Sequence, residues 1–171
     1  MTNSILLNIL KDQVTPALGC TEPIAVALAV AKAKEILGSS PPRRIEIKVD
    51  RNIFKNALAV GIPGTDEKGL HMAVALALVA GKSKYNLEVL KDITAVDVLK
   101  AQEIISNNII HVTIAENIVG LYVEVTAACQ QEKVRVMIKD KHDNIVLVEK
   151  NDKVIFKKEE IKENKVSLIE S

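Results

Sequence analysis

The sequence predicts an α+β fold in which alanine-rich helices pack on a mixed, largely antiparallel sheet. Two alanine-rich apolar runs, 23–37 and 69–80, have the length and composition of buried helices. From residue 110 to residue 156, apolar and polar residues instead alternate with the period of two that is typical of strands. A chain of 171 residues that is 48% hydrophobic can enclose a core. We therefore expect a single domain, 1–171.

Apolar spacing and helix-ending residues define the expected helices. Apolar residues at helical spacing in 5–10 predict a short first helix, which ends before Pro16. The helix at 23–37 is apolar nearly all round at first and ends at the Gly38–Pro42 turn, so its first half should be buried. Gly81 closes the helix at 69–80. Apolar spacing predicts a short helix at 87–90 and a longer one at 96–105.

The expected strands begin with Arg44–Asp50, where apolar and charged residues alternate strictly. Residues 52–56 depart from that alternation, 57–62 read as a second strand, and Pro63-Gly64-Thr65 reads as a turn. The tail at 157–171 is charged and weakly patterned, as in a terminal helix or a frayed end. Five further alternating runs predict a meander of short strands: 110–114, 121–126, 133–139, 145–149 and 154–156.

Composition excludes several classes of protein. The 23 basic and 22 acidic residues leave a net charge of +1, so nucleic acid and anionic membranes are not expected partners. Aromatic residues make up 2% of the chain, too few for base stacking. The two cysteines, Cys20 and Cys129, follow no zinc or disulfide spacing, and the N-terminus lacks signal-peptide features. We expect a soluble cytoplasmic protein with no metal site of its own.

The turn from Pro16 to Pro23 concentrates chemistry just before the first long helix. Gly19 permits unusual backbone angles, and Thr21 is placed to cap the helix. Cys20 should lie at the helix N-terminus, where the helix dipole favours an anion, so its thiol should ionise more readily than a free thiol. Such a thiolate can act as a base or nucleophile. The alternative is that Cys20 is a small buried apolar residue and Thr21 only a cap.

Four sequence blocks carry a resemblance to a known family. They are T-P-A-L-G-C-T-E-P-I-A-V-A-L-A at 15–29, N-I-F-K-N-A-L-A-V-G-I-P-G-T at 52–65, L-E-V-L-K-D-I-T at 87–94 and H-D-N-I-V-L-V-E at 142–149. In this order they resemble the cysteine desulfidase family, which is related to the alpha part of bacterial iron-sulfur L-serine dehydratase. The first block is the specific one. Members of that family are more than twice as long, so the resemblance places this chain in the N-terminal part of a longer enzyme.

The resemblance implies a carbon-sulfur lyase that converts L-cysteine to pyruvate, ammonia and sulfide in cysteine catabolism. Its cofactor would be a 4Fe-4S cluster, held by cysteines outside this chain, and not pyridoxal phosphate. Cys20 matches the cysteine taken as the base that removes the α-proton. Partners would be an amino-acid substrate and a C-terminal cluster-bearing part or subunit, with a homo-oligomer left open. Since two cysteines cannot hold a cluster, we expect the chain alone to be inactive. The alternatives are an L-serine dehydratase-like hydro-lyase and a non-catalytic amino-acid-binding or regulatory module.

The same blocks indicate further substrate contacts, each with a structural alternative. Thr21 and Glu22 could orient the substrate or only begin the helix, and Lys55 could bind a carboxylate or be solvated. Cys129 reads as inert core, and His71 and His111 as surface or strand residues. The candidate substrate-binding residues are Thr21, Glu22, Asn52, Lys55, Asn56, Thr65, His142 and Asn144.

Overall fold

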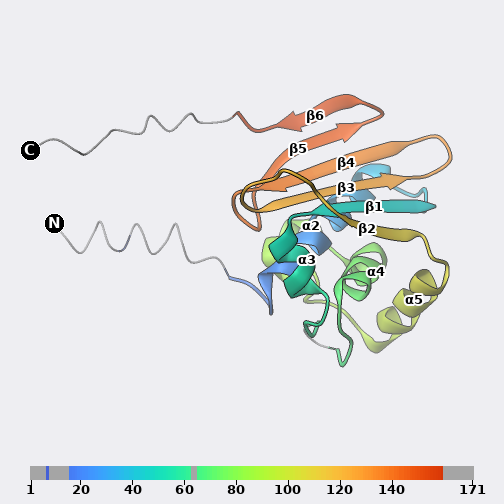
Figure 1. The fold of residues 1–171 in the computed structure, drawn as a ribbon. Helices are drawn as coiled ribbons and strands as arrows, with labels where there is room; N and C mark the ends of the chain where they lie inside the picture. The colour runs from blue at the N-terminus through green and yellow to red at the C-terminus, as the bar shows by residue number, and fades with distance from the viewer. Residues whose placement is uncertain (1–6, 8–15, 63–64, 160–171) are drawn as a thin grey trace, which may run out of the picture.

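The computed structural model describes residue 7, residues 16–62 and residues 65–159, and it confirms the α+β class (Figure 1). The first helix expected at 5–10, the Pro63-Gly64 part of the turn and the tail from residue 160 lie outside the described residues, apart from Leu7. The described helices are α2 (Thr21–Leu37), α3 (Arg51–Ala57), α4 (Leu70–Ala80) and α5 (Ala95–Ser106), with a 3-10 helix, η1 (Ser83–Glu88).

The six strands among the described residues form one mixed sheet in the order β2-β1-β3-β4-β5-β6. Of these strands only β1 and β2 run parallel; every other neighbouring pair is antiparallel. The strands are β1 (Arg44–Val49), β2 (Ile110–Ile114), β3 (Tyr122–Ala128), β4 (Lys133–Lys139), β5 (Ile145–Lys150) and β6 (Lys153–Lys157).

Three predictions about elements are wrong. The run 110–114 is a strand, but it pairs with β1 and not with β3, so the meander has four strands and not about five. Residues 57–62 form no strand; this segment contains the end of α3 and one isolated bridge between Gly61 and Lys68. The short helix expected at 87–90 is instead the last two residues of a 3-10 helix, Ser83–Glu88, followed by a turn. The predicted helices at 23–37, 69–80 and 96–105 are confirmed to within two residues at each end.

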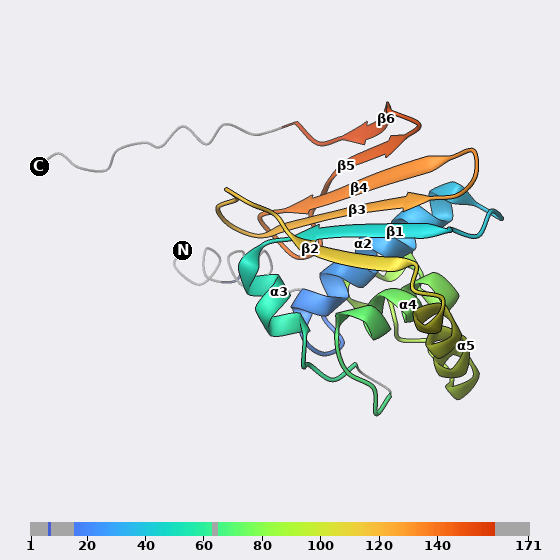
Figure 2. The same cartoon turned by 45° about the vertical axis from the view of Figure 1, so that its right-hand side comes forward.

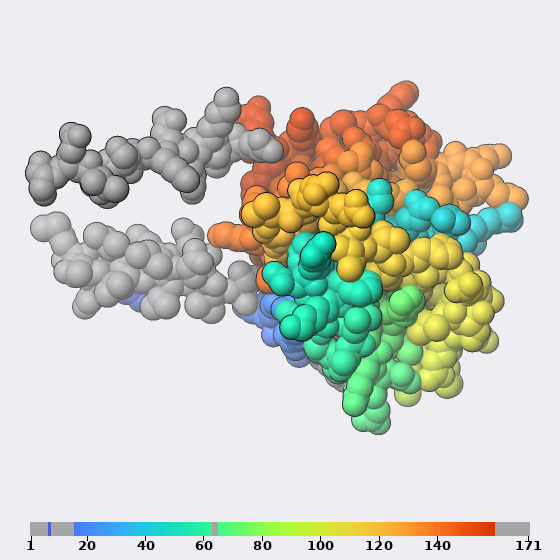
Figure 3. Space-filling model, in the orientation of Figure 1, coloured from blue at the N-terminus to red at the C-terminus, as the bar shows by residue number. Residues whose placement is uncertain are grey.

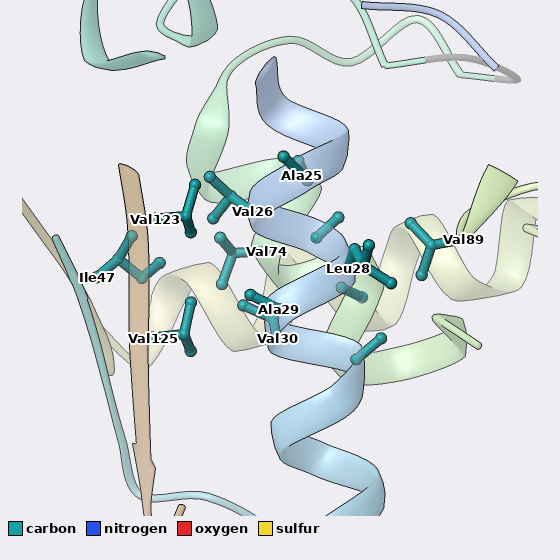
Figure 4. Close-up of a cluster of buried hydrophobic side chains, with 14 of the residues drawn as sticks. Ala25, Val26, Leu28, Ala29, Val30, Ile47, Val74, Val89, Val123 and Val125 are labelled. Atoms are coloured by element: carbon teal, nitrogen blue, oxygen red, sulfur yellow. The ribbon is translucent and has the colours of Figure 1, made fainter. Parts of the chain in front are cut away.

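Helix α2 lies at the centre of the fold. The helices lie on one face of the sheet, with α2 between the sheet and α4 (Figures 1 and 2). Its residues from Pro23 to Ala31 are all buried, as expected for a helix covered on several sides. Val26, Ala29 and Val30 face Val123 and Val125 of the sheet, while Leu28 points towards Val89 (Figure 4).

Small side chains allow α2 and α4 to approach closely. A Cβ atom added to Gly81, the residue after α4, would lie 2.7 Å from the Cα atom of Ala77 and 3.1 Å from the Cβ atom of Ala31 in α2. A side chain at position 81 would therefore collide with the backbone of α4 and crowd α2, so glycine is needed where α4 ends. Among the described residues, no helix combines the length and apolar character needed to cross a bilayer.

Candidate functional site

The turn before α2 places Cys20 at the helix start. Gly19 has a φ of 86°, which favours glycine, and Cys20 returns to extended backbone (φ −71°, ψ 129°) as the residue before the first helical one. The expected position of Cys20 is confirmed. The prediction that Thr21 caps the helix is wrong, because Thr21 is itself the first helical residue and no side chain caps α2.

Glu22 is the residue that joins the site together. Its Oε2 atom accepts a hydrogen bond from the Cys20 thiol (2.7 Å) and a longer one from the Thr21 hydroxyl (3.4 Å). Its Oε1 atom accepts from the side-chain amide of Asn56 in α3 (3.1 Å). The charge of His142, in the turn between β4 and β5, also acts on this carboxyl group. Residues from three separately predicted blocks therefore act on one carboxylate, two of them through hydrogen bonds and His142 through its charge.

The thiol of Cys20 is protonated in this arrangement, contrary to the prediction of a readily ionised thiol. Partial burial is the main cause that raises its pKa, and the hydrogen bond donated to Glu22 raises it further. Both effects outweigh the favourable helix start. The pKa of Glu22 is lowered, first by the hydrogen bond from Cys20 and less by Asn56 and His142. At neutral pH the site consists of a thiol beside a carboxylate.

The other predicted substrate-binding residues either stabilise turns or are exposed to solvent. The Thr65 hydroxyl donates to the carbonyl of Ile62 (3.0 Å) and accepts from the amide of Glu67 (3.1 Å). Asn144 donates to the carbonyl of Lys139 (2.9 Å) and accepts from Lys158 (2.7 Å). Asn52 and Lys55 are exposed on α3. Thr65 and Asn144 thus stabilise turns. Among the described residues, neither side chain makes a hydrogen bond to the Cys20 cluster, which consists of Cys20, Glu22, Asn56 and His142.

The role of Glu22 as acceptor of the Cys20 proton was not predicted. The signal was the Cys-x-Glu spacing across a helix start, which directs the carboxylate of the second helical residue back to the residue before the helix. Asn56 was predicted as a substrate contact, but its partner, 34 residues earlier, could not be read from a local pattern.

The described residues do not fit an iron-sulfur cluster. Among residues 16–62 and 65–159, no three His, Cys, Asp or Glu side chains are grouped so that they could hold a metal ion. Cys20 and Cys129 are free thiols, and that of Cys20 donates to Glu22. Cys129 is partly buried against the core, as predicted. This part of the chain therefore provides no ligand set for a cluster.

Comparisons with known proteins connect the chain to longer relatives. It is similar to a UPF0597 protein of Clostridium tetani, with 54% identity over 158 residues, which is 92% of this chain and 37% of the relative. A UPF0597 protein of Caldanaerobacter subterraneus is 49% identical over 162 residues, 94% of this chain and 38% of the relative. One from Parabacteroides distasonis is 45% identical over 150 residues, 88% and 35%.

The chain thus spans a little over a third of the length of these relatives. Their shared name states no activity. No protein-family model matches the chain, and no solved structure matches it. These comparisons therefore indicate no activity for the longer proteins.

The hydrogen bond between Cys20 and Glu22 predicts how the thiol titrates. In a Cys129→Ser background, the Cys20 thiol should ionise above its ordinary pKa of 9.0. Glu22→Gln should lower that pKa, because the anionic acceptor that favours the protonated thiol is removed. Thiolate absorbance in the ultraviolet, followed against pH, measures both values. An unchanged titration in Glu22→Gln would contradict the assigned contact.

Proposed function

We propose that this chain supplies the proton-abstracting part of a carbon-sulfur lyase that acts on L-cysteine, with Cys20 as the base. The resemblance of the Cys20 block to cysteine desulfidases supports this reaction class. The observation that carries the proposal is the 2.7 Å hydrogen bond from the Cys20 thiol to Glu22, because it gives the thiol proton an acceptor at the moment the sulfur becomes a base.

The proposed reaction is a β-elimination. The thiol proton passes to Glu22, and the Cys20 sulfur then takes the α-proton of L-cysteine. The carbon-sulfur bond of the substrate breaks, and its electron pair leaves with the sulfur as hydrosulfide. The hydrosulfide takes the proton from Glu22 and departs as hydrogen sulfide, which restores the thiol of Cys20 and the carboxylate of Glu22. The remaining 2-aminoacrylate becomes its imine, which water hydrolyses to pyruvate and ammonia. Each L-cysteine thus consumes one water and gives one pyruvate, one ammonia and one hydrogen sulfide.

Asn56 and His142 act through Glu22 in this scheme. Asn56 holds the Oε1 atom, which leaves Oε2 directed at Cys20. His142, in its protonated form, lowers the pKa of this carboxylate. Both are positioning residues. In the cysteine desulfidase family, which the chain resembles, a 4Fe-4S cluster supplies a Lewis acid. Because the described residues hold no site for such a cluster, we assign to this chain the proton transfer alone and place the cluster in a C-terminal part or partner.

One observation favours a second candidate, a non-catalytic amino-acid-binding module. The resting site holds a protonated thiol beside a partly exposed carboxylate. A carboxylate of this kind can bind the ammonium group of an amino acid without any proton transfer. Binding of L-cysteine without turnover by the complete protein would favour this candidate.

A chimeric protein tests the proposed activity. The matched segment of the Clostridium tetani relative is replaced by this chain, and both the chimera and the unaltered relative are supplied with iron and sulfide under anaerobic conditions. We expect both to form pyruvate from L-cysteine, and this chain alone to form none. Pyruvate is measured because added sulfide would obscure the second product. Folded proteins that bind L-cysteine without forming pyruvate would contradict the proposal, and pyruvate from L-serine alone would indicate the hydro-lyase.

A further inference from the structure

Strand β6 is an exposed apolar edge of the sheet. It pairs with β5 on one side, and no other described strand lies on its second side. All five of its residues are exposed, among them Val154, Ile155 and Phe156 at 56%, 53% and 46%. Its atoms, red in Figure 3, form the upper rim of the molecule in that view. Natural proteins usually cover or interrupt such an edge, because its free amide and carbonyl groups can pair with another strand.

A bulge turns two of these side chains towards the helix side. Val148 pairs with Phe156 and Glu149 with Val154, so Ile155 is the extra residue. Ile155 and Phe156 then line one hollow with Ile145 and Val148 of β5 and Ile36 of α2, in a volume of about 690 Å³. We call this hollow the β6 groove. The groove is open because α2 packs chiefly on β3 and β4 and leaves this end of the sheet uncovered. Its walls are mainly apolar.

The charges around the β6 groove select between occupants. Lys153 and Lys157 flank the apolar residues of β6, and Lys32 and Lys158 line the groove together with one acidic residue, Asp143, so that basic residues predominate. An antiparallel pair of β6 strands centred on Ile155 would set Lys153 of one copy opposite Lys157 of the other, and like charges in that position are destabilising. The same lysines would attract a strand that carries acidic residues at its ends.

We propose that the β6 groove binds an extended segment from the part of the longer relatives that this chain does not span. That part is more than half of each relative, so it provides ample polypeptide to cover the edge. The segment adds a seventh strand beside β6, places apolar side chains on Ile155 and Phe156, and sets Asp or Glu near the lysines. Binding of this segment does not depend on the lyase activity.

One end of the β6 groove lies at the turn between β4 and β5. Asp143 and Asn144 line the β6 groove, and the adjacent His142 acts on Glu22. A segment in the groove would therefore contact the same turn that contributes to the site, so that binding at β6 brings the second part of the longer protein to the edge of the site.

Synthetic peptides test this assignment because strand addition recognises a linear segment. Overlapping peptides that cover the unmatched part of the Clostridium tetani relative are titrated against this chain, and hydrogen exchange locates the bound peptide. We expect at least one apolar peptide with acidic ends to bind, to protect the amides of β6, and to bind more weakly at high salt. Phe156→Glu should weaken that binding by about tenfold or more, because it places a charge at an apolar anchor.

Two variants separate a lost contact from a lost fold. Exchanging Lys153 and Lys157 for glutamate should weaken binding while the strand remains. Leu99→Glu, at an exposed apolar site on α5 (64% exposed, against 46% for Phe156), should leave affinity unchanged. Absence of any binding peptide, or protection away from β6, would overturn the proposal. Self-association of the chain in sedimentation that Phe156→Glu abolishes would overturn it in favour of a second copy.

Discussion

Replacing Asp50 with alanine is expected to lower the free energy of unfolding by about 3 kcal/mol, because a buried carboxylate that accepts three backbone amides is lost. Asp50 is 6% exposed. Its Oδ1 atom accepts from the amides of Asn52 (2.8 Å) and Ile53 (3.1 Å) at the start of α3, and its Oδ2 atom accepts from that of Tyr122 in β3 (2.9 Å). Urea denaturation followed by circular dichroism measures the change.

The matched variants identify which of these contacts matters. Asp50→Asn keeps an oxygen for the cap of α3 but turns an amide group towards Tyr122, so its loss should be intermediate. Asp152→Asn removes the charge of an 81%-exposed carboxylate that pairs with Lys133, and asparagine tolerates the φ of 62° at this position, so stability should change by less than about 1 kcal/mol. Equal stability of Asp50→Ala and Asp152→Asn would show that the buried contacts contribute nothing.

Asp50 also explains why α3 was not predicted from the sequence. The alternation in Arg44–Asp50 predicted β1 correctly, because a half-buried strand imposes a period of two. Residues 51–57 lack a long helical pattern, and their helix depends on Asp50 as a cap and on the burial of Ile53 and Ala57. A helix this short is specified by its contacts more than by its own sequence.

Pairing between distant strands also limited the prediction from the sequence. The run 110–114 has the same local pattern as the strands of the meander. It differs from them only in its place, which is at the edge of the sheet beside β1. That place follows from the segment of α3, α4 and α5 between β1 and β2, which allows a parallel pair that a tight turn would not.

The candidate site was predicted in its members but not in its connections. Cys20, Glu22, Asn56 and His142 were all identified from local blocks, yet the sequence suggested an ionised thiol and the structure has a protonated one. The helix start acts on Cys20 as expected, but a carboxylate two residues away and partial burial act in the opposite direction and are stronger.

In the chimera proposed above, Cys20→Ser should reduce kcat for pyruvate formation by about 10²-fold to 10⁴-fold, the usual contribution of a general base. Serine can still donate a hydrogen bond to Glu22, so the local structure is kept. Its hydroxyl, however, has far too high a pKa to yield its proton to a carboxylate and become a base. Cys129→Ser, at the other free cysteine, should leave kcat unchanged. Activity within tenfold of the unaltered chimera in Cys20→Ser would exclude the sulfur as the base.

A Glu22→Gln variant of the same chimera separates proton transfer from simple positioning. Glutamine can still accept from the thiol and contact Asn56, but it cannot take a proton. We expect kcat at neutral pH to fall and to recover as the pH rises through the Cys20 pKa, because without an acceptor only a thiol that has already lost its proton to solvent can act as the base. If Glu22 only held the thiol in place, glutamine would hold it as well and kcat at neutral pH would stay near that of the unaltered chimera. The new dependence on pH therefore distinguishes a carboxylate that accepts the proton from one that only holds the thiol.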